Sequence, residues 1–225
     1  MKLFITTKNL DYIRNTQEIE LLTKECGGCR PDIIASSAGK YPARMAHVIR
    51  KLITCRFSDY DEIFVGFAPQ LIIPFFEGKF RRYRNDGGKV TIDFFISVYD
   101  TLVNDRKKIK KGSVPASVAA WLDKRTISLA DNVVVDTKAH GEYFTENFGL
   151  SRDKMQVLYL EADKSVYYPH TVKRAEEDAD KRIILYFASM LPLQGVETVL
   201  EAAKLMKDDK NIIFKIIGPV KNKVI

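Results

Sequence analysis

Few residues in this 225-residue chain have the spacing of a known reactive centre. Cys26 and Cys29 show the C-x-x-C spacing of a redox or metal-binding pair. A metal site needs further Cys, His or acidic ligands, yet the remaining cysteine is Cys55 and the three histidines lie far away in the sequence. The spacing therefore favours an ordinary loop, and we expect neither a bound metal nor another cofactor.

A second group of polar residues follows predicted strands. In an open parallel sheet the carboxyl ends of the strands meet at one edge, where loops and helix N-termini converge and ligands bind. Asp100 is one polar residue expected at this edge, and a capping or turn aspartate is the alternative interpretation. The whole set expected at this edge is Gln70, Ser97, Tyr99, Asp100 and Thr137.

Nucleotide-binding loops of the common kinds are missing from the sequence. A nicotinamide-dependent dehydrogenase would need a glycine-rich turn after the first strand, but the segment Thr6–Leu10 contains no glycine. The P-loop pattern is absent as well. These two enzyme classes are therefore disfavoured.

The chain is basic, with 36 Lys and Arg against 29 Asp and Glu and a formal net charge of +7. Such a balance favours partners that carry phosphate, acidic lipid or nucleic acid. Five cations lie within 106–111, and the alternative interpretation of such a cluster is a solvated face. No aromatic-basic module is present, so we expect no nucleic acid partner, although a basic nucleic-acid-binding protein remains the alternative from a different class.

An apolar run at 71–76 precedes Lys79, Arg81, Arg82 and Arg84. This order predicts a segment at an anionic membrane surface, with a buried helix and a basic solvent-exposed end as the alternative. No stretch reaches the ~18 apolar residues of a membrane span. We expect a cytoplasmic protein, with the inner face of the membrane as a candidate location.

Short apolar runs alternate with amphipathic segments, which predicts an α/β fold with parallel strands and crossover helices. Thr16 is expected to cap the first helix and Gly149 to end a later one. The predicted strands are 3–6, 32–36, 62–67, 89–98, 132–136, 156–160, 182–188 and 211–217. The predicted helices are 16–25, 42–56, 114–130, 139–148 and 195–206.

Residues 169–181 combine a proline with many charges and almost no large apolar side chains, which predicts a linker. The predicted arrangement is a complete domain at 1–168, the linker, and the beginning of a second domain at 182–225. One strand-helix-strand unit exposes both edges of its sheet. We therefore expect the second domain to be incomplete.

Three segments together resemble the family-four glycosyltransferases of the GT-B fold. Residues 130–137 (ADNVVVDT) are similar to the family's segment that leads into the last strand of its first domain. Residues 154–169 are similar to the run that crosses between its domains, and residues 186–204 to the opening strand and helix of its second domain. The three segments occur in the family's order.

The resemblance implies two facing Rossmann-like domains and a retaining, metal-independent transfer of a hexosyl group from a nucleotide sugar to a saccharide. The acceptor is expected to be a growing, lipid-linked glycan. Asp100 would then be the catalytic contact to the acceptor hydroxyl, with Gln70, Ser97, Tyr99 and Thr137 beside it. The donor phosphates would approach Ser189, Gln194 and Gly195.

The chain departs from the family at positions that matter for donor binding. The family commonly places an Arg and a Lys on the donor diphosphate, where this chain has the uncharged Ser189 and Gln194. The family's paired glutamates would fall beyond residue 225. We therefore expect little or no transferase activity from this chain alone. The alternatives are a non-catalytic acceptor-binding half of a split or decayed transferase, with a complementary C-terminal half as partner in the split case, and a sugar-nucleotide epimerase on the same scaffold.

Overall fold

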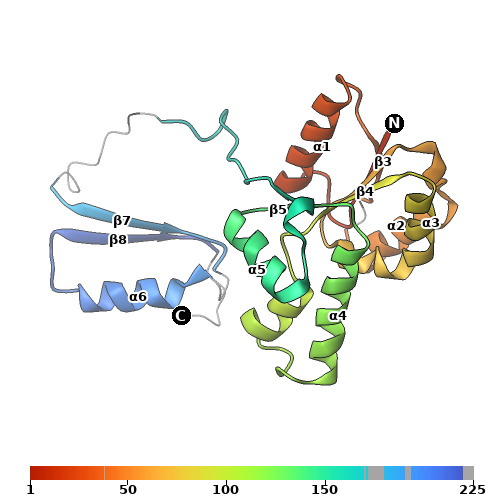
Figure 1. The fold of residues 1–225 in the computed structure, drawn as a ribbon. Helices are drawn as coiled ribbons and strands as arrows, with labels where there is room; N and C mark the ends of the chain where they lie inside the picture. The colour runs from red at the N-terminus through yellow and green to blue at the C-terminus, as the bar shows by residue number, and fades with distance from the viewer. Residues whose placement is uncertain (38, 170, 172–179, 191–193, 220–225) are drawn as a thin grey trace. The chain divides into compact units, whose positions relative to one another are not determined.

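The computed structural model describes residues 1–37, 39–169, 171, 180–190 and 194–219. The chain divides into two compact units, Met1–Glu161 and Ala162–Ile225 (Figure 1). Most of the predicted linker, namely residues 170 and 172–179, lies outside the described residues.

The first unit is built on a six-stranded sheet in which every neighbouring pair of strands is parallel. Its order is β2-β1-β3-β4-β5-β6, so the chain begins next to one edge, forms that edge with β2, and then crosses β1 to add the other four strands in sequence. This arrangement confirms the predicted α/β class with parallel strands. The strands are β1 (Lys2–Ile5), β2 (Asp32–Ile34), β3 (Glu62–Val65), β4 (Lys89–Asp93), β5 (Asn132–Val135) and β6 (Met155–Val157).

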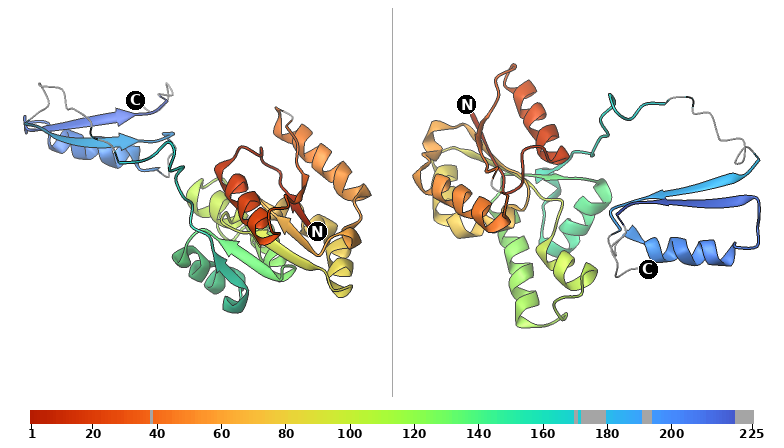
Figure 2. Two further views of the ribbon diagram at one scale, coloured as in Figure 1. Left: turned by 90° about the horizontal axis from the view of Figure 1, so that it is seen from above. Right: turned by 180° about the vertical axis from the view of Figure 1, so that it is seen from behind.

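Five helices cover the two faces of this sheet unequally. Viewed from the front and from behind, α1 lies on one side of the sheet and α4 on the other (Figures 1 and 2). The larger core cluster joins the sheet to α2, α3, α4 and α5, whereas the smaller one joins it to α1. The helices are α1 (Ile13–Glu25), α2 (Tyr41–Thr54), α3 (Glu77–Asn85), α4 (Val114–Ser128) and α5 (Lys138–Phe148).

Alternation of side chains along the strands produces the two cores. On β1, Leu3 and Ile5 belong to the larger cluster and Phe4 to the smaller one, because successive residues point to opposite faces. Phe4 stacks against Phe64 of β3 with ring centroids 5.6 Å apart. Both rings are almost completely buried, so this pair anchors the α1 side of the sheet.

The helix ends agree with the sequence in one place and differ in another. Gly149 ends α5 at φ 76°, the left-handed conformation expected of it. The prediction for Thr16 was wrong, because α1 begins at Ile13 and Tyr12 takes the N-cap position. The Thr16 hydroxyl instead donates to the backbone carbonyl of Leu10 from within the first turn.

The apolar run at 71–76 is part of the core. Ile72 and Ile73 are fully buried, and Phe75 is the member that is strongly exposed, at 70%. The run forms short 3₁₀ turns that lead into α3, a helix the sequence did not predict. Lys79 donates to the carbonyls of Leu52 and Cys55 instead of facing solvent. Ile72 and Ile73 therefore have a packing role, and Phe75 is the exposed apolar side chain of the run. The membrane surface expected there stays a prediction.

The segment after β4 also differs from prediction. The strand was expected to continue to residue 98, but it ends at Asp93, and the chain forms a π-helix at Asp100–Asp105. π-Helical turns are rare and are frequently found at functional sites. This turn begins at the residue that the sequence analysis ranked first.

The second unit contains the predicted strand-helix-strand sequence. Its parallel strands β7 (Arg182–Phe187) and β8 (Ile212–Ile217) pair along six residues, and α6 (Val196–Leu205) connects them. Val196 is the one buried apolar residue among the described residues of this unit. Gly218 lies so close to the Ala188 carbonyl that an added Cβ would be 2.2 Å from its oxygen. Among all described residues, no helix is both long and apolar enough to cross a membrane.

Candidate functional site

The loop that follows β4 is held in place by a fully buried carboxylate on α4, that of Asp123. Asp123 Oδ1 accepts hydrogen bonds from Gln70 Nε2 and from the Val98 backbone N–H, each at 3.0 Å. Oδ2 accepts from Ser97 Oγ at 2.7 Å and from the Tyr99 backbone N–H at 2.9 Å. Burial raises the pKa of Asp123, and the four donors offset part of that increase. The sequence analysis missed this residue because nothing in its local pattern shows that it faces the core.

Two of the predicted substrate contacts, Gln70 and Ser97, lie beneath this loop. Gln70 is fully buried, and its Nε2 also donates to the Ile96 carbonyl at 2.6 Å. Ser97 is 3% exposed, and its Oγ accepts from the Asp100 backbone N–H. Their described hydrogen bonds fix the course of residues 96–100, so both residues shape the site from inside.

Asp100 lies at the surface of the same loop, as the first residue of the π-helix. Its Oδ1 accepts from Tyr143 Oη of α5 at 3.1 Å and from Asn104 Nδ2 at 2.6 Å. Tyr99 packs its ring against Phe148 of α5, with centroids 6.3 Å apart. Asp100 is thus a half-buried carboxylate whose position is fixed by two neighbouring donors.

A histidine that the sequence analysis did not select lies at the carboxyl end of β5. His140 Nδ1 is 2.8 Å from Asp136 Oδ1, and its ring stacks on Phe144 with centroids 4.5 Å apart. Thr137 caps α5 by accepting from the His140 backbone N–H. The hydrogen bond to Asp136 raises the pKa of His140. The sequence does contain a pattern that could have indicated this pair. Asp136 directly follows a strand, and His140 comes four residues later in the first turn of a helix, a spacing at which side chains can meet.

A buried ion cluster connects this edge to α1. Arg14 Nη2 donates to Asp93 Oδ1 at 2.8 Å, and Arg14 Nε lies 3.5 Å from Glu18 Oε1. All three side chains are at most 3% exposed. Asp136 acts electrostatically on both Arg14 and Asp93, which places the cluster and the His140 pair in one neighbourhood.

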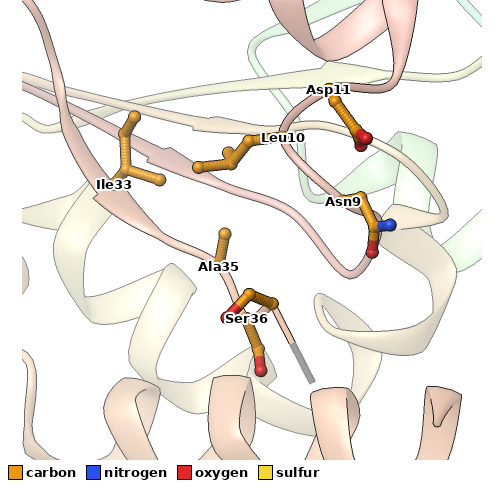
Figure 3. A pocket seen from close by; sticks show the side chains of 7 residues that line it. Asn9, Leu10, Asp11, Ile33, Ala35 and Ser36 are labelled. Atoms are coloured by element: carbon orange, nitrogen blue, oxygen red, sulfur yellow. The ribbon is translucent and has the colours of Figure 1, made fainter. Parts of the chain in front are cut away.

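A hollow at the same edge of the sheet lies between the loops after β1 and β2. Its volume is about 510 Å3, and Figure 3 shows Asn9 and Asp11 on one loop, opposite Ala35 and Ser36 on the other. Leu10 and Ile33 supply its apolar surface. Amide, carboxylate and hydroxyl groups beside apolar carbon suit a neutral polyhydroxyl ligand.

The residues predicted to approach the donor lie in the second unit. Gly195 is the N-cap of α6, with φ 71°, and the Gln194 carbonyl accepts from Tyr186 Oη at 3.0 Å. Ser189 is exposed and follows β7 by two residues. Residues 191–193 between them lie outside the described residues.

Metal-binding clusters are not found among the described residues. Cys26 and Cys29 are free thiols, and Cys26 ends α1. Gly27 and Gly28 follow with positive φ angles, so this segment is a turn.

No known family pattern matches the chain, and no curated protein matches it. Among solved structures, HepE from Anabaena in complex with UDP-glucose is similar to this chain. The similarity covers 99% of this chain and 70% of the HepE chain. The two share 11% sequence identity, with a TM-score of 0.48. Similarity this distant assigns no activity, and the function proposed below depends on this chain's own residues.

The arrangement offers groups that recognise hydroxyls and move protons. Asp100 is a fixed acceptor, and Asp136 orients the His140 ring through Nδ1, which leaves Nε2 without a partner among the described residues. A carboxylate-oriented imidazole is a recurring device in proton transfer. The first unit therefore has the chemistry to bind a substrate rich in hydroxyl groups at the carboxyl edge of its sheet.

Proposed function

We propose that the protein takes part in glycosyl transfer, with a hexosyl group passing from a nucleotide sugar to a hydroxyl of a saccharide. The support comes from the three segments that resemble family-four GT-B glycosyltransferases. The first contains β5, the second contains β6, and the third includes the end of β7 and most of α6. In this proposal the first unit binds the acceptor, the second unit binds the donor, and transfer retains the anomeric configuration.

The observation that carries the proposal is the fixed loop after β4. Asp123 holds residues 97–99 from below, so that Asp100 meets Tyr143 at the open edge of the sheet. We assign Asp100 to the acceptor hydroxyl, with Tyr99 and Thr137 lining the same side. Gln70 and Ser97 act as positioning residues, because their polar groups bond to the loop and to Asp123.

The donor side would depend on backbone groups. Gly195 begins α6, a helix of ten residues whose N-terminus carries a partial positive charge that favours phosphate. Ser189 and Gln194 provide no formal charge at the positions where the family has cations. We therefore expect donor affinity below that of an enzyme with both cations.

The test is a transfer assay with UDP- and GDP-hexoses and an oligosaccharide panel, using the full chain and two variants. Asp100→Asn should lower transfer by about 10- to 100-fold, because the variant loses a charged hydrogen-bond acceptor. Asp105→Asn, at the other end of the same π-helix, should leave transfer unchanged. Equal activity of the two variants would contradict the role given to Asp100.

A second candidate, an acceptor-binding half without transferase activity, is favoured by the uncharged Ser189 and Gln194. Ligand-observed NMR with the saccharide panel, followed by titration with fluorescent UDP- and GDP-sugars, separates the two. Binding of saccharide without binding of donor would support this candidate. Binding of neither ligand would argue against both.

A further inference from the structure

The first two turns of helix α4 expose large apolar residues, while the helix buries mainly small and polar ones; its buried large apolar residue, Ile127, lies near the other end. Val114, Val118 and Trp121 are 78%, 51% and 54% exposed. The face turned toward the core instead carries Ala116, Ala119, Asp123 and Thr126, each at most 3% exposed. A helix that serves only the fold shows the opposite distribution.

The three exposed residues form one stripe. Their spacing of four and then three residues places them on the same face along the first two turns of α4. Residues three and seven positions after Ala116 are buried, so the stripe lies on the outward side. Apolar residues that are exposed singly are common on protein surfaces, whereas exposed apolar residues that lie side by side are typical of an interaction site.

Five cations immediately precede this stripe in the chain. They are all exposed, and none forms an ion pair within the described part of the first unit. In Figure 1 the connection that precedes α4 lies at the end of that helix away from the sheet. We call the combined feature the α4 tip surface; it consists of Arg106, Lys107, Lys108, Lys110, Lys111, Val114, Val118 and Trp121.

We propose that the α4 tip surface docks on a lipid bilayer that contains anionic lipids. Exposed Trp and aliphatic side chains partition into the interface between headgroups and acyl chains, and adjacent lysines are attracted to lipid phosphate. Charge complementarity supports this occupant, since five exposed cations, none ion-paired within the described residues of the first unit, directly precede the apolar stripe in the chain. Each lysine near an anionic bilayer strengthens binding by about fivefold.

Nucleic acid would use this surface less completely. Phosphates would engage the cations, and a base could stack on Trp121, but Val114 and Val118 have no role in binding a polyanion. The aliphatic part of the stripe therefore favours lipid.

The surface also lies close to the candidate site along the chain. The π-helix begins at Asp100 and leads directly into the cationic segment. If the proposed function holds, docking would place a lipid-linked acceptor near Asp100; the docking itself does not depend on sugar transfer.

The chain provides its own probe, because Trp121 is its single tryptophan. The full chain is titrated with phosphatidylcholine vesicles and with vesicles that contain roughly one third phosphatidylglycerol. We expect a blue shift of the Trp121 emission with the anionic vesicles alone, and its reversal as salt rises. No shift with either vesicle would overturn the proposal, and so would a shift produced by a DNA duplex but not by vesicles.

Variants locate the surface by vesicle co-sedimentation. Lys108→Glu with Lys110→Glu should weaken binding by at least about 25-fold, from fivefold for each lost lysine. Val118→Ser should weaken it further without changing the charge. The matched controls on α2 are Arg50→Glu and Ile53→Ser, both at exposed positions, and they should bind as the wild type does. Loss of binding in the controls, or its retention in the α4 variants, would contradict this assignment, and urea unfolding checks that each variant is folded.

Discussion

Glu18 is a fully buried carboxyl on α1. Burial raises its pKa well above the usual value of 4.5, and the Asp93 carboxylate raises it further. One cation, Arg14, lies between two acids, so ionising both would leave an uncompensated buried negative charge. Neither Glu18 oxygen accepts a hydrogen bond among the described residues. The cluster is therefore best satisfied when Glu18 is protonated and its O–H donates a hydrogen bond to the Asp93 carboxylate.

This arrangement predicts how stability depends on pH. A carboxyl whose pKa is higher in the folded state contributes stability that is fully present below 4.5 and is lost as pH rises toward the folded value. Glu18→Gln keeps a donor for Asp93 and removes the ionisation. We expect its free energy of unfolding to exceed that of the wild type at pH 8 by about 1.4 kcal/mol for each unit of pKa shift.

Urea unfolding at pH 5 and pH 8 checks this prediction. Glu20→Gln, at an exposed position on the same helix, is the matched control and should follow the wild type at both values. If Glu18→Gln and the wild type lose the same stability between pH 5 and pH 8, Glu18 is already ionised in the fold.

At the scale of elements, one side chain of α4 determines the loop that precedes it. Asp123 receives two backbone and two side-chain donors, and each carboxylate oxygen accepts one of the backbone N–H groups. The helix thereby fixes the position of residues 97–99 more firmly than the loop sequence could alone. Such networks are costly to leave partly satisfied.

Replacing Asp123 by Asn should therefore be strongly destabilising. An amide has one acceptor oxygen, so in either orientation its NH2 group faces the backbone N–H of Val98 or of Tyr99. We expect a loss of about 2 to 4 kcal/mol in the free energy of unfolding, together with faster amide exchange at residues 97–100. Lys124→Ala, at the exposed neighbouring position, is the control and should change neither the free energy of unfolding nor amide exchange at residues 97–100. If Asp123→Asn also leaves both quantities unchanged, the loop is held by other contacts.

At the scale of the whole molecule, the two units differ in how much apolar surface they bury. The strands β1, β3 and β4 lie within a core closed by helices, whereas in the second unit Leu185, Phe187 and Ile217 are 56%, 75% and 59% exposed. Amide protection follows local burial and contact density. The units should therefore open independently and at different free energies.

Hydrogen exchange measured by mass spectrometry tests this contrast. Peptides from β7 and β8 should exchange at least about tenfold faster than peptides from β1, β3 and β4, a difference of roughly 1.4 kcal/mol in opening free energy. Peptides from the exposed ends of α2 provide the internal reference for fast exchange. Equal protection of the two sheets would mean that the second unit is stabilised by contacts beyond its own core.

The local sequence was sufficient for the elements of the fold. In the part of the chain that the structure describes, all eight strands and five of the six α-helices follow from apolar runs and helical spacing, because side-chain period is a property of neighbouring residues. Helix α3 was missed because Glu77–Asn85 is dominated by charge and has few apolar positions. Asp100 could also be selected as a candidate from the sequence, because it lies in the segment that follows a strand of an open parallel sheet.

Tertiary structure decided which of these elements face each other and what each face does. Arg14 and Asp93 are 79 residues apart in sequence, and only the parallel crossovers bring them together. Ile72 and Ile73 of the apolar run at 71–76 entered the core, while the stripe on α4 remained outside, although both segments carry large apolar side chains. Periodicity specifies that a face exists, whereas its burial depends on whether another element covers it, and that is set by the packing of the whole unit.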